Sequence, residues 1–172
     1  ERRAVATTVG AGGNLLNLWA YDLVRGGASR FTFGDEGYFN PVWSPDGRQV
    51  AYGRVDGSVV VKPADGSSEP KTVASALPNP FPSSWSPDGR FLAISAQDLR
   101  AGGLDLWIVP LNTGQKPYPF LATPASERDP NFSPDGRWIS YPSDESGRTE
   151  RYVAPFPGPG GERLHTSGGA AA

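Results

Sequence analysis

The stretch Trp43-Ser44-Pro45-Asp46-Gly47-Arg48 decides how this chain folds, because it occurs three times. It returns as residues 85–90 (WSPDGR) and, with phenylalanine in first place, as residues 132–137 (FSPDGR). The copies are 42 and 47 residues apart, which is the repeat length of a four-stranded propeller blade. The repeat therefore predicts a fold and a style of binding, and it names no reaction.

The motif is predicted to be a tight turn that reverses a strand. Proline presets φ at the second turn position, aspartate can accept a hydrogen bond from the main chain two residues on, and glycine supplies a positive φ. The aromatic residue before the turn can anchor the incoming strand. The residues assigned to this structural turn are Trp43, Pro45, Asp46, Gly47, Trp85, Pro87, Asp88, Gly89, Phe132, Pro134, Asp135 and Gly136.

The residues after each turn alternate, as expected for a strand packed on both faces. Two positions separated by one residue point to the same face. They hold Val50, Leu92 and Ile139 in the first place and Tyr52, Ile94 and Tyr141 in the second. The residues between them are small, which lets a neighbouring sheet approach the second face closely. A later strand in each repeat carries an aromatic in one register, at Trp19, Trp107 and Tyr152, whereas residues 59–61 (VVV) form the least aromatic strand of this set.

Composition agrees with an all-β chain and excludes several kinds of chemistry. There are 22 glycines and 18 prolines among 172 residues, and no window has a helical apolar period. The net charge of −2 is spread over interspersed acids and bases, so we expect no nucleic-acid partner. With no cysteine, disulfides and thiolate chemistry are excluded. No apolar run is long enough to cross a bilayer, so we expect no membrane insertion by this segment.

The strand signals group into four blades of one β-propeller array over residues 1–166. Their expected ranges are about 3–34, 40–74, 81–122 and 129–166, with residues 167–172 as a flexible tail. The first blade lacks its innermost strand. The prediction is thus a β-propeller of four-stranded antiparallel blades, about four in this chain, that forms part of a larger or paired propeller.

The pattern (D/N)P-x-(W/F)SPDGR followed by alternating residues resembles the TolB-type (WD40-like) β-propeller repeat over nearly the whole chain. The copy that begins at Asp129, continued through Tyr152 and Val153, is also similar to the propeller segments of bacterial membrane Ser/Thr kinases. The resemblance implies a bacterial protein and an extracytoplasmic (periplasmic) location. TolB-like propellers usually have six blades, which this chain does not reach. Either it belongs to a larger propeller, or two copies pair face to face in an isologous dimer of about eight blades; we favour self-association as a homo-oligomer.

No catalytic residue, cofactor site or metal site is predicted. The repeated Asp46, Asp88 and Asp135 share one turn context, so we interpret them as structural. His165, in a terminal strand, has no obvious acid and nucleophile partners, and there is no G-x-S-x-G elbow, kinase signature or P-loop. The acidic turns at 35–37 and 144–147 lack the ligand count of a calcium loop. This chain is therefore not expected to be an enzyme by itself.

The candidate contact residues lie in the loops that precede each inner strand, because these loops gather at one mouth of a propeller channel. They mix charges with aromatics, which is typical of protein or peptide contacts, although the aromatics could instead only cap the blades. The candidates are Asp35, Glu36, Tyr38, Phe39, Asn40, Asn79, Phe81, Glu127, Arg128 and Asp129. We expect a non-catalytic module that binds a protein or ligand, the sensor or interaction part of a larger protein. The alternative is the gating propeller of a prolyl-oligopeptidase-like serine hydrolase whose catalytic domain is absent.

Overall fold

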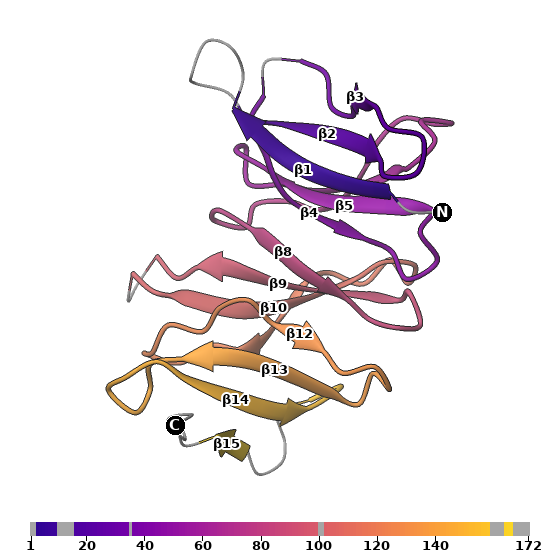
Figure 1. Ribbon diagram of the computed structural model, residues 1–172. Coiled ribbons are helices and arrows are strands. Elements are labelled where there is room, and N and C mark those ends of the chain that lie inside the picture. The colour runs from indigo at the N-terminus through magenta and orange to yellow at the C-terminus, as the bar shows by residue number, and fades with distance from the viewer. Residues whose placement is uncertain (1–2, 10–15, 35, 100–101, 159–163, 167–172) are drawn as a thin grey trace, which may run out of the picture. The chain divides into compact units, whose positions relative to one another are not determined.

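The computed structural model describes residues 3–9, 16–34, 36–99, 102–158 and 164–166. Within these ranges the chain contains strands and no helix, and the strands form four antiparallel sheets (Figure 1). The expected flexible tail, residues 167–172, lies outside the described residues. The predicted all-β fold is confirmed.

Each sheet is a meander in which sequential strands pair as neighbours. Blade 1 has β1 (Arg3–Val9), β2 (Leu16–Asp22) and β3 (Ala28–Arg30). Blade 2 has β4 (Tyr38–Trp43), β5 (Gln49–Arg54), β6 (Val59–Pro63) and β7 (Lys71–Ala74). Blade 3 has β8 (Phe81–Trp85), β9 (Phe91–Gln97), β10 (Leu104–Pro110) and β11 (Tyr118–Leu121). Blade 4 has β12 (Asn131–Phe132), β13 (Trp138–Ser143), β14 (Glu150–Pro155) and β15 (Leu164–Thr166).

The described part of blade 1 is a three-stranded sheet, as expected from the missing turn motif. In blades 2, 3 and 4 an inner strand flanks β5, β9 and β13, whereas β1 pairs only with β2. The exposure of the strands differs accordingly. β9 is buried at five of its seven residues, and none of the seven residues of β1 is fully buried.

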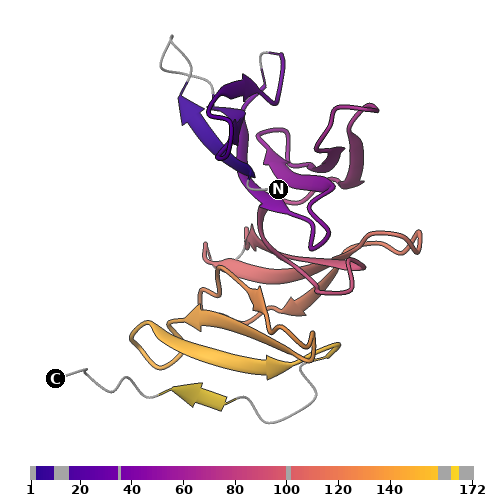
Figure 2. The same cartoon turned by 45° about the vertical axis from the view of Figure 1, so that its right-hand side comes forward.

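The chain divides into two compact units, Glu1–Pro82 and Ser83–Ala172, and two sheets pack together in each. In both views the β1–β3 sheet lies beside the β4–β7 sheet, and the β8–β11 sheet beside the β12–β15 sheet (Figures 1 and 2). The first unit buries a cluster formed by Leu18, Phe31, Tyr38, Val50, Tyr52 and Val60. The second buries Ala93, Leu106, Ile108, Phe120, Leu121, Ile139, Tyr141, Tyr152 and Ala154.

The alternation predicted after each turn is present in the cores. Val50, Leu92 and Ile139 are fully buried, and so are the residues two positions on. Ala51 and Ala93, the small residues between them, are also without exposed surface. Both faces of these strands are therefore covered, which explains why the sequence runs apolar on both faces instead of alternating apolar with polar.

The three repeated turns have the same hydrogen bonds. In the first copy the Ser44 N–H donates to the Gln49 carbonyl at 2.9 Å and the Gly47 N–H donates to the Ser44 carbonyl at 2.9 Å. The Asp46 carboxylate accepts from the Ser44 hydroxyl at 2.6 Å and from the Arg48 N–H at 3.0 Å. The same contacts recur at Ser86 and Asp88 and at Ser133 and Asp135.

The serine side chain joins the hydrogen bonds of this turn, in addition to the predicted contributions of proline, aspartate and glycine. Its hydroxyl donates to the aspartate and accepts the N–H of the first strand residue, at 2.9 Å in the pair Ser86 and Phe91. Serine therefore links the side-chain and main-chain parts of the turn. The arginines meet solvent, since Arg90 and Arg137 are exposed and pair with the aspartate of their own turn.

Hydrogen bonding keeps the turn aspartates ionised. The serine hydroxyl, followed by the arginine N–H, lowers the pKa of Asp46 and Asp135. At Asp88, burial alone would raise the pKa, but hydrogen bonds from Ser86 and Arg90 outweigh it and the pKa is again lowered. A carboxylate that is held by hydrogen-bond donors in this way stabilises a turn and is a poor general base.

We predict that Ser86→Ala lowers the free energy of unfolding by about 1–3 kcal/mol, because the buried Ser86 hydroxyl is the acceptor of the part-buried Phe91 N–H, which would lose its partner. Urea denaturation followed by circular dichroism measures this change. Ser146→Ala, in an exposed turn of blade 4, is the matched control and should change stability by less than about 0.5 kcal/mol. Equal effects of the two substitutions would contradict the role assigned to Ser86.

Candidate functional site

The loops that enter the inner strands share an unusual backbone. Asn40, Asn79 and Asp129 each have a positive φ, of 49°, 43° and 46°. Each also precedes a proline, which disfavours helical conformations of the residue before it. Asparagine and aspartate tolerate the left-handed region better than other non-glycine residues. Asn79 and Asp129 therefore fix the path of their loops. Asn40 was expected in such a loop, but it lies within β4, at the register shift between Phe39 and Val42. All three side chains are exposed.

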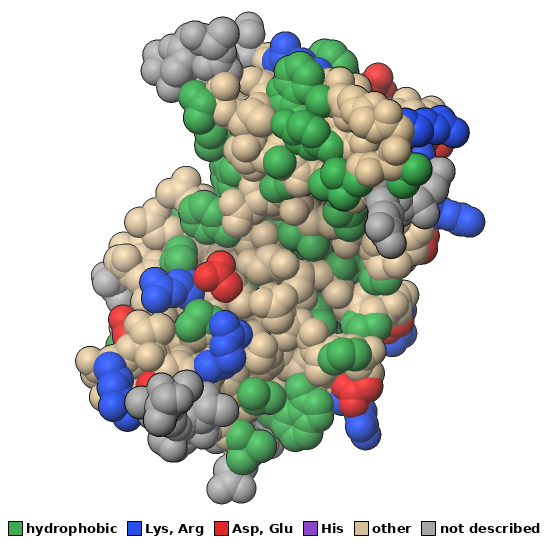
Figure 3. Space-filling model, viewed as in Figure 1, with side chains coloured by type: hydrophobic (Ala, Val, Ile, Leu, Met, Phe, Trp, Pro, Cys, Tyr) green, Lys and Arg blue, Asp and Glu red, His purple; other side chains and the backbone are tan. Residues whose placement is uncertain are grey.

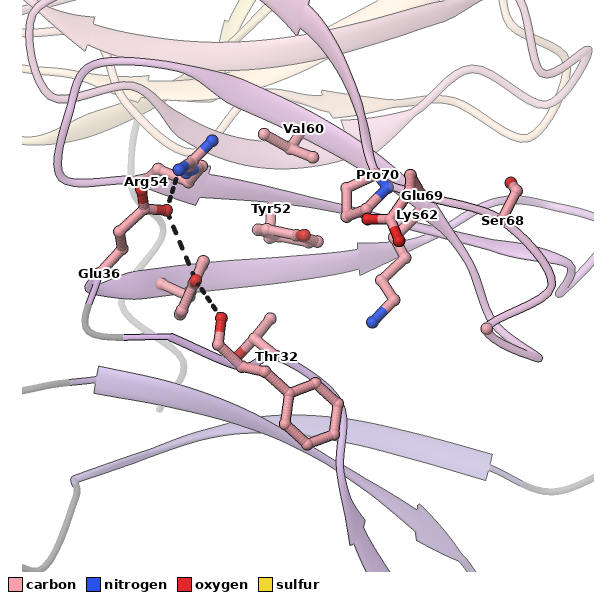
Figure 4. Close-up of a pocket in the computed structure, with 12 residues that line it drawn as sticks. Thr32, Glu36, Tyr52, Arg54, Val60, Lys62, Ser68, Glu69 and Pro70 are labelled. Atoms are coloured by element: carbon pink, nitrogen blue, oxygen red, sulfur yellow. Dashed lines mark hydrogen bonds and ion pairs between the residues drawn. The ribbon is translucent and has the colours of Figure 1, made fainter.

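In the first unit, the buried side chain of Tyr38 holds Phe33 and Glu36 in place. Its side chain is 5% exposed, and its hydroxyl donates to the Phe33 carbonyl at 2.7 Å. The same hydroxyl lies 3.4 Å from the Glu36 carboxylate, which also forms an ion pair with Arg54 (Figure 4). Glu36 is thus exposed but held in place. Asp35 lies outside the described residues.

Phe39 and Phe81 meet over a glycine. Their ring centroids are 5.4 Å apart, and both side chains are half-buried. A Cβ added at Gly53 would lie 2.5 Å from the Phe39 ring and 2.5 Å from the Pro80 carbonyl oxygen. Only glycine leaves room for this contact. Each of the two aromatic candidates therefore has one part of its side chain packed against the blade and another part exposed to solvent.

In the second unit, Glu127 is fully buried and anchors the loop that leads into blade 4. Its N–H donates to the Leu104 carbonyl at 2.7 Å, and its carboxylate accepts from the Thr123 hydroxyl. The Asp129 N–H donates to the Ser95 hydroxyl at 3.0 Å. Arg128 and Asp129 have exposed side chains on this anchored backbone.

The structure thus sorts the candidate residues by exposure. Tyr38 and Glu127 are buried and position their loops, and Phe39 and Phe81 are half-buried. The exposed candidates are Glu36, Asn40, Asn79, Arg128 and Asp129. This division could not be read from composition, because it depends on which side chains the adjacent blade covers.

No arrangement for catalysis is seen within the described residues. The turn aspartates are engaged by their own serines, and the described residues hold no group of three histidine, cysteine or acidic side chains that could bind a metal ion. His165 lies on β15, where its backbone pairs with Tyr152 of β14.

One feature missed in the sequence is a cavity of about 360 Å³ in the first unit, between the sheets of blades 1 and 2. Lys62 of β6 extends into it beside Tyr52, with Thr32 on the opposite wall (Figure 4). The sequence does contain a signal for this cavity, namely the residue type at one position of β6. Val60 stands where the other blades carry Trp19, Trp107 and Tyr152.

A comparison with protein families settles what the repeat is. The family described as the TolB beta propeller domain matches residues 26–172. The chain belongs to this family. Among curated proteins it is similar to the "Uncharacterized peptidase YuxL" of Bacillus subtilis (strain 168), with 24% identity in an alignment of length 165 that covers 73% of this chain and 24% of the relative.

Solved structures confirm the fold of this TolB-family chain. A protein described as a TolB from Agrobacterium tumefaciens superposes with a TM-score of 0.77 at 19% identity, over 98% of this chain and 63% of that one. A prolyl endopeptidase superposes with a TM-score of 0.62 at 15% identity, over 88% of this chain and 26% of the other. The chain thus spans about a quarter of its curated relative. In its described part, no helix is long and apolar enough to span a membrane.

We predict that Gly53→Ala destabilises the first unit by about 1–3 kcal/mol, because the added methyl overlaps the Phe39 ring and the Pro80 carbonyl. Denaturant unfolding measures the loss, and Phe39 amide exchange should quicken with it. Gly158→Ala is the control, since a Cβ there meets no atom within 4 Å. A stable Gly53→Ala variant would show that the contact is not required.

Proposed function

We propose that this chain is a non-catalytic binding module that contacts a protein or peptide partner through the loops entering its inner strands. The observation that carries the proposal is the pairing of exposed side chains with a fixed backbone. Glu36, Asn79 and Arg128 project from loops held by positive φ angles, prolines and buried anchors. Rigid loops lose little conformational entropy when a partner binds, which favours recognition.

The chemistry of these loops also fits a partner that is neither nucleic acid nor lipid. In the first unit Glu36 forms an ion pair with Arg54, and in the second unit acidic Asp129 adjoins basic Arg128, so these candidate residues form no single-sign patch in either unit. Mixed charges beside half-buried aromatics resemble the rim and core of protein contacts. We propose that the module lies outside the cytoplasm, in the periplasm of a bacterium, as the sensor or interaction part of a larger protein. Its membership of the TolB family supports this proposal.

Selection from a displayed peptide library tests this proposal without knowledge of the natural partner. Peptides enriched on the wild-type chain should bind at least tenfold more weakly to a variant carrying Glu36→Gln, Asn79→Gly and Arg128→Ala. These changes keep the positive φ at residue 79 and the buried anchors. A variant with Asn112→Ala and Lys116→Ala, both exposed in the loop between β10 and β11, is the control. The proposed contact surface would be contradicted if the selected peptides bound the triple variant as well as the wild type and lost binding to the control variant instead.

The second candidate function is the gating propeller of a prolyl-oligopeptidase-like hydrolase. The similarity to a protein called a peptidase and the fold shared with a prolyl endopeptidase favour it. The parent gene discriminates between the two. A G-x-S-x-G elbow with a following aspartate and histidine beyond residue 172 supports the hydrolase, whereas a transmembrane span and kinase motifs before residue 1 support the sensor.

We further propose that the isolated chain self-associates to cover blade 1. The open β1–β2 face carries half-buried Trp19 and Tyr21, opposite Ala6 and Ala4 of β1, and Figure 3 shows apolar side chains gathered over these strands. The corresponding face of blade 4, with Tyr141 and Tyr152, is fully covered by blade 3. An equivalent neighbour on blade 1 would bury the aromatic surface that lies bare there.

Light scattering during size exclusion measures this association. We expect a mass of about twice 18.3 kDa at micromolar concentrations. Tyr21→Lys places a charge on the open face and should return the chain to a monomer, because a buried unpaired ammonium is costly. Val55→Lys, at an exposed turn of blade 2, is the control. A monomeric wild-type chain would contradict the proposal.

A further inference from the structure

The cavity between blades 1 and 2 has a filled counterpart in the second unit, which makes it a departure from the repeat. In the gap between blades 3 and 4, Tyr152 is 4% exposed and stacks on Tyr141, with ring centroids 5.9 Å apart. In blade 2 the residue at the place of Tyr152 is Val60, opposite Tyr52. Valine in place of an aromatic ring leaves open the volume that the second unit fills.

Lys62 is the second departure in the same blade. Two residues beyond the aromatic register, blades 3 and 4 carry Val109 and Ala154, both with no exposed surface. Blade 2 places an ammonium there. Two independent changes toward an open and charged gap occur on one face of one strand. Packing alone gives no reason for them, because an aliphatic residue fits the equivalent position in blades 3 and 4, where a neighbouring sheet also covers the strand.

The ammonium of Lys62 has one hydrogen bond to the protein that fixes its position, and it has further N–H donors that a ligand could use. It donates to the Phe31 carbonyl at 2.7 Å and lies 4.8 Å from the centroid of the Phe31 ring. Lysine has three N–H donors, so this bond uses one of them. Among the described residues no carboxylate lies within ion-pair distance of Lys62, whereas Arg54 is neutralised by Glu36. Burial lowers the pKa of Lys62, and the charge of Glu69 opposes that shift.

The residues that line the cavity determine what kind of group can bind beside the Lys62 ammonium. Three of its lining residues, Tyr38, Tyr52 and Val60, are buried, each at most 5% exposed, whereas Phe33 and Pro70 line it and are exposed. This buried apolar surface suits a hydrocarbon or aromatic body. Glu36 and Glu69 line the same cavity, so they repel a multiply charged anion more strongly than a singly charged one. A volume of about 360 Å³ lies at the lower end of the range for small-molecule sites.

We propose that this cavity binds an organic monocarboxylate with an apolar body, its carboxylate on the Lys62 ammonium and its body against Tyr52 and Val60. The carboxylate belongs either to a free acid or to the C-terminus of a peptide, since both present the same group. Glu36 and Tyr38 belong both to the cavity lining and to the candidate contact residues, whereas Lys62 and Val60 belong to the cavity alone. Substitutions at Lys62 and Val60 therefore test the cavity independently of the proposed partner contact.

Titration followed by amide chemical shifts tests the site, with Gly66 and Ser68 at the cavity as reporters. The probe is 3-phenylpropionate, and the uncharged 3-phenylpropionamide is its control. We expect saturable binding of the acid, at least tenfold tighter than that of the amide. The peptide acetyl-Gly-Gly-Phe, with a free or amidated C-terminus, distinguishes the two sources. Binding of the free-terminus peptide assigns the site to peptide termini, and binding of the acid alone assigns it to small acids.

Two variants decide whether Lys62 and the cavity are responsible. Lys62→Met should remove the preference for the acid, and Val60→Tyr should remove binding of both probes by filling the cavity as Tyr152 fills its counterpart. Lys116→Met, at an exposed loop, should bind like the wild type. If Val60→Tyr does not fold, Lys62→Met alone still decides. Equal binding of acid and amide, an unchanged Lys62→Met variant or no saturable binding would each overturn the proposal.

Discussion

The hydrogen bonds of a single serine hydroxyl are the constraint on which each complete blade depends. Ser44, Ser86 and Ser133 donate to the turn aspartate and accept the first N–H of the following strand. This links the turn to the strand that carries the core residues. Because side-chain period in a strand is two, a slip of one residue here would turn the buried positions to the wrong face.

The same arrangement explains why the repeat holds such different side chains elsewhere. Each turn satisfies its own polar groups, so the blades differ freely in what they place between them. The second unit fills its gap with Tyr152 and Ala154, and the first leaves an open, charged gap at Val60 and Lys62. Departures from a repeat that keep the turn intact are therefore informative about binding and not about folding.

The sequence predicted the blades, the turns and the buried alternation, because these depend on residues close together in the chain. It could not predict which candidate contacts are exposed. Tyr38 and Glu127 are covered by packing of the preceding blade, and Lys62 bonds to a carbonyl 31 residues away. The sequence indicated Asn40 as a contact residue because of its polar side chain. Its positive φ gives a second, structural reason for asparagine at this position, and that reason is not visible in the sequence. The sequence showed that residues 59–61 lack an aromatic side chain. That this leaves a cavity could be seen only once the position of the neighbouring sheet was known.

The single pairing of β1 has a practical consequence for handling the molecule. Its outer edge presents unshared amide and carbonyl groups, and residues 4–9 (AVATTV) contain neither a charge nor a proline that would discourage another extended chain from adding to it. In concentrated or partly unfolded preparations, this edge is where fibrous or amorphous aggregates would begin. A lysine introduced at Ala6 would act there as a gatekeeper.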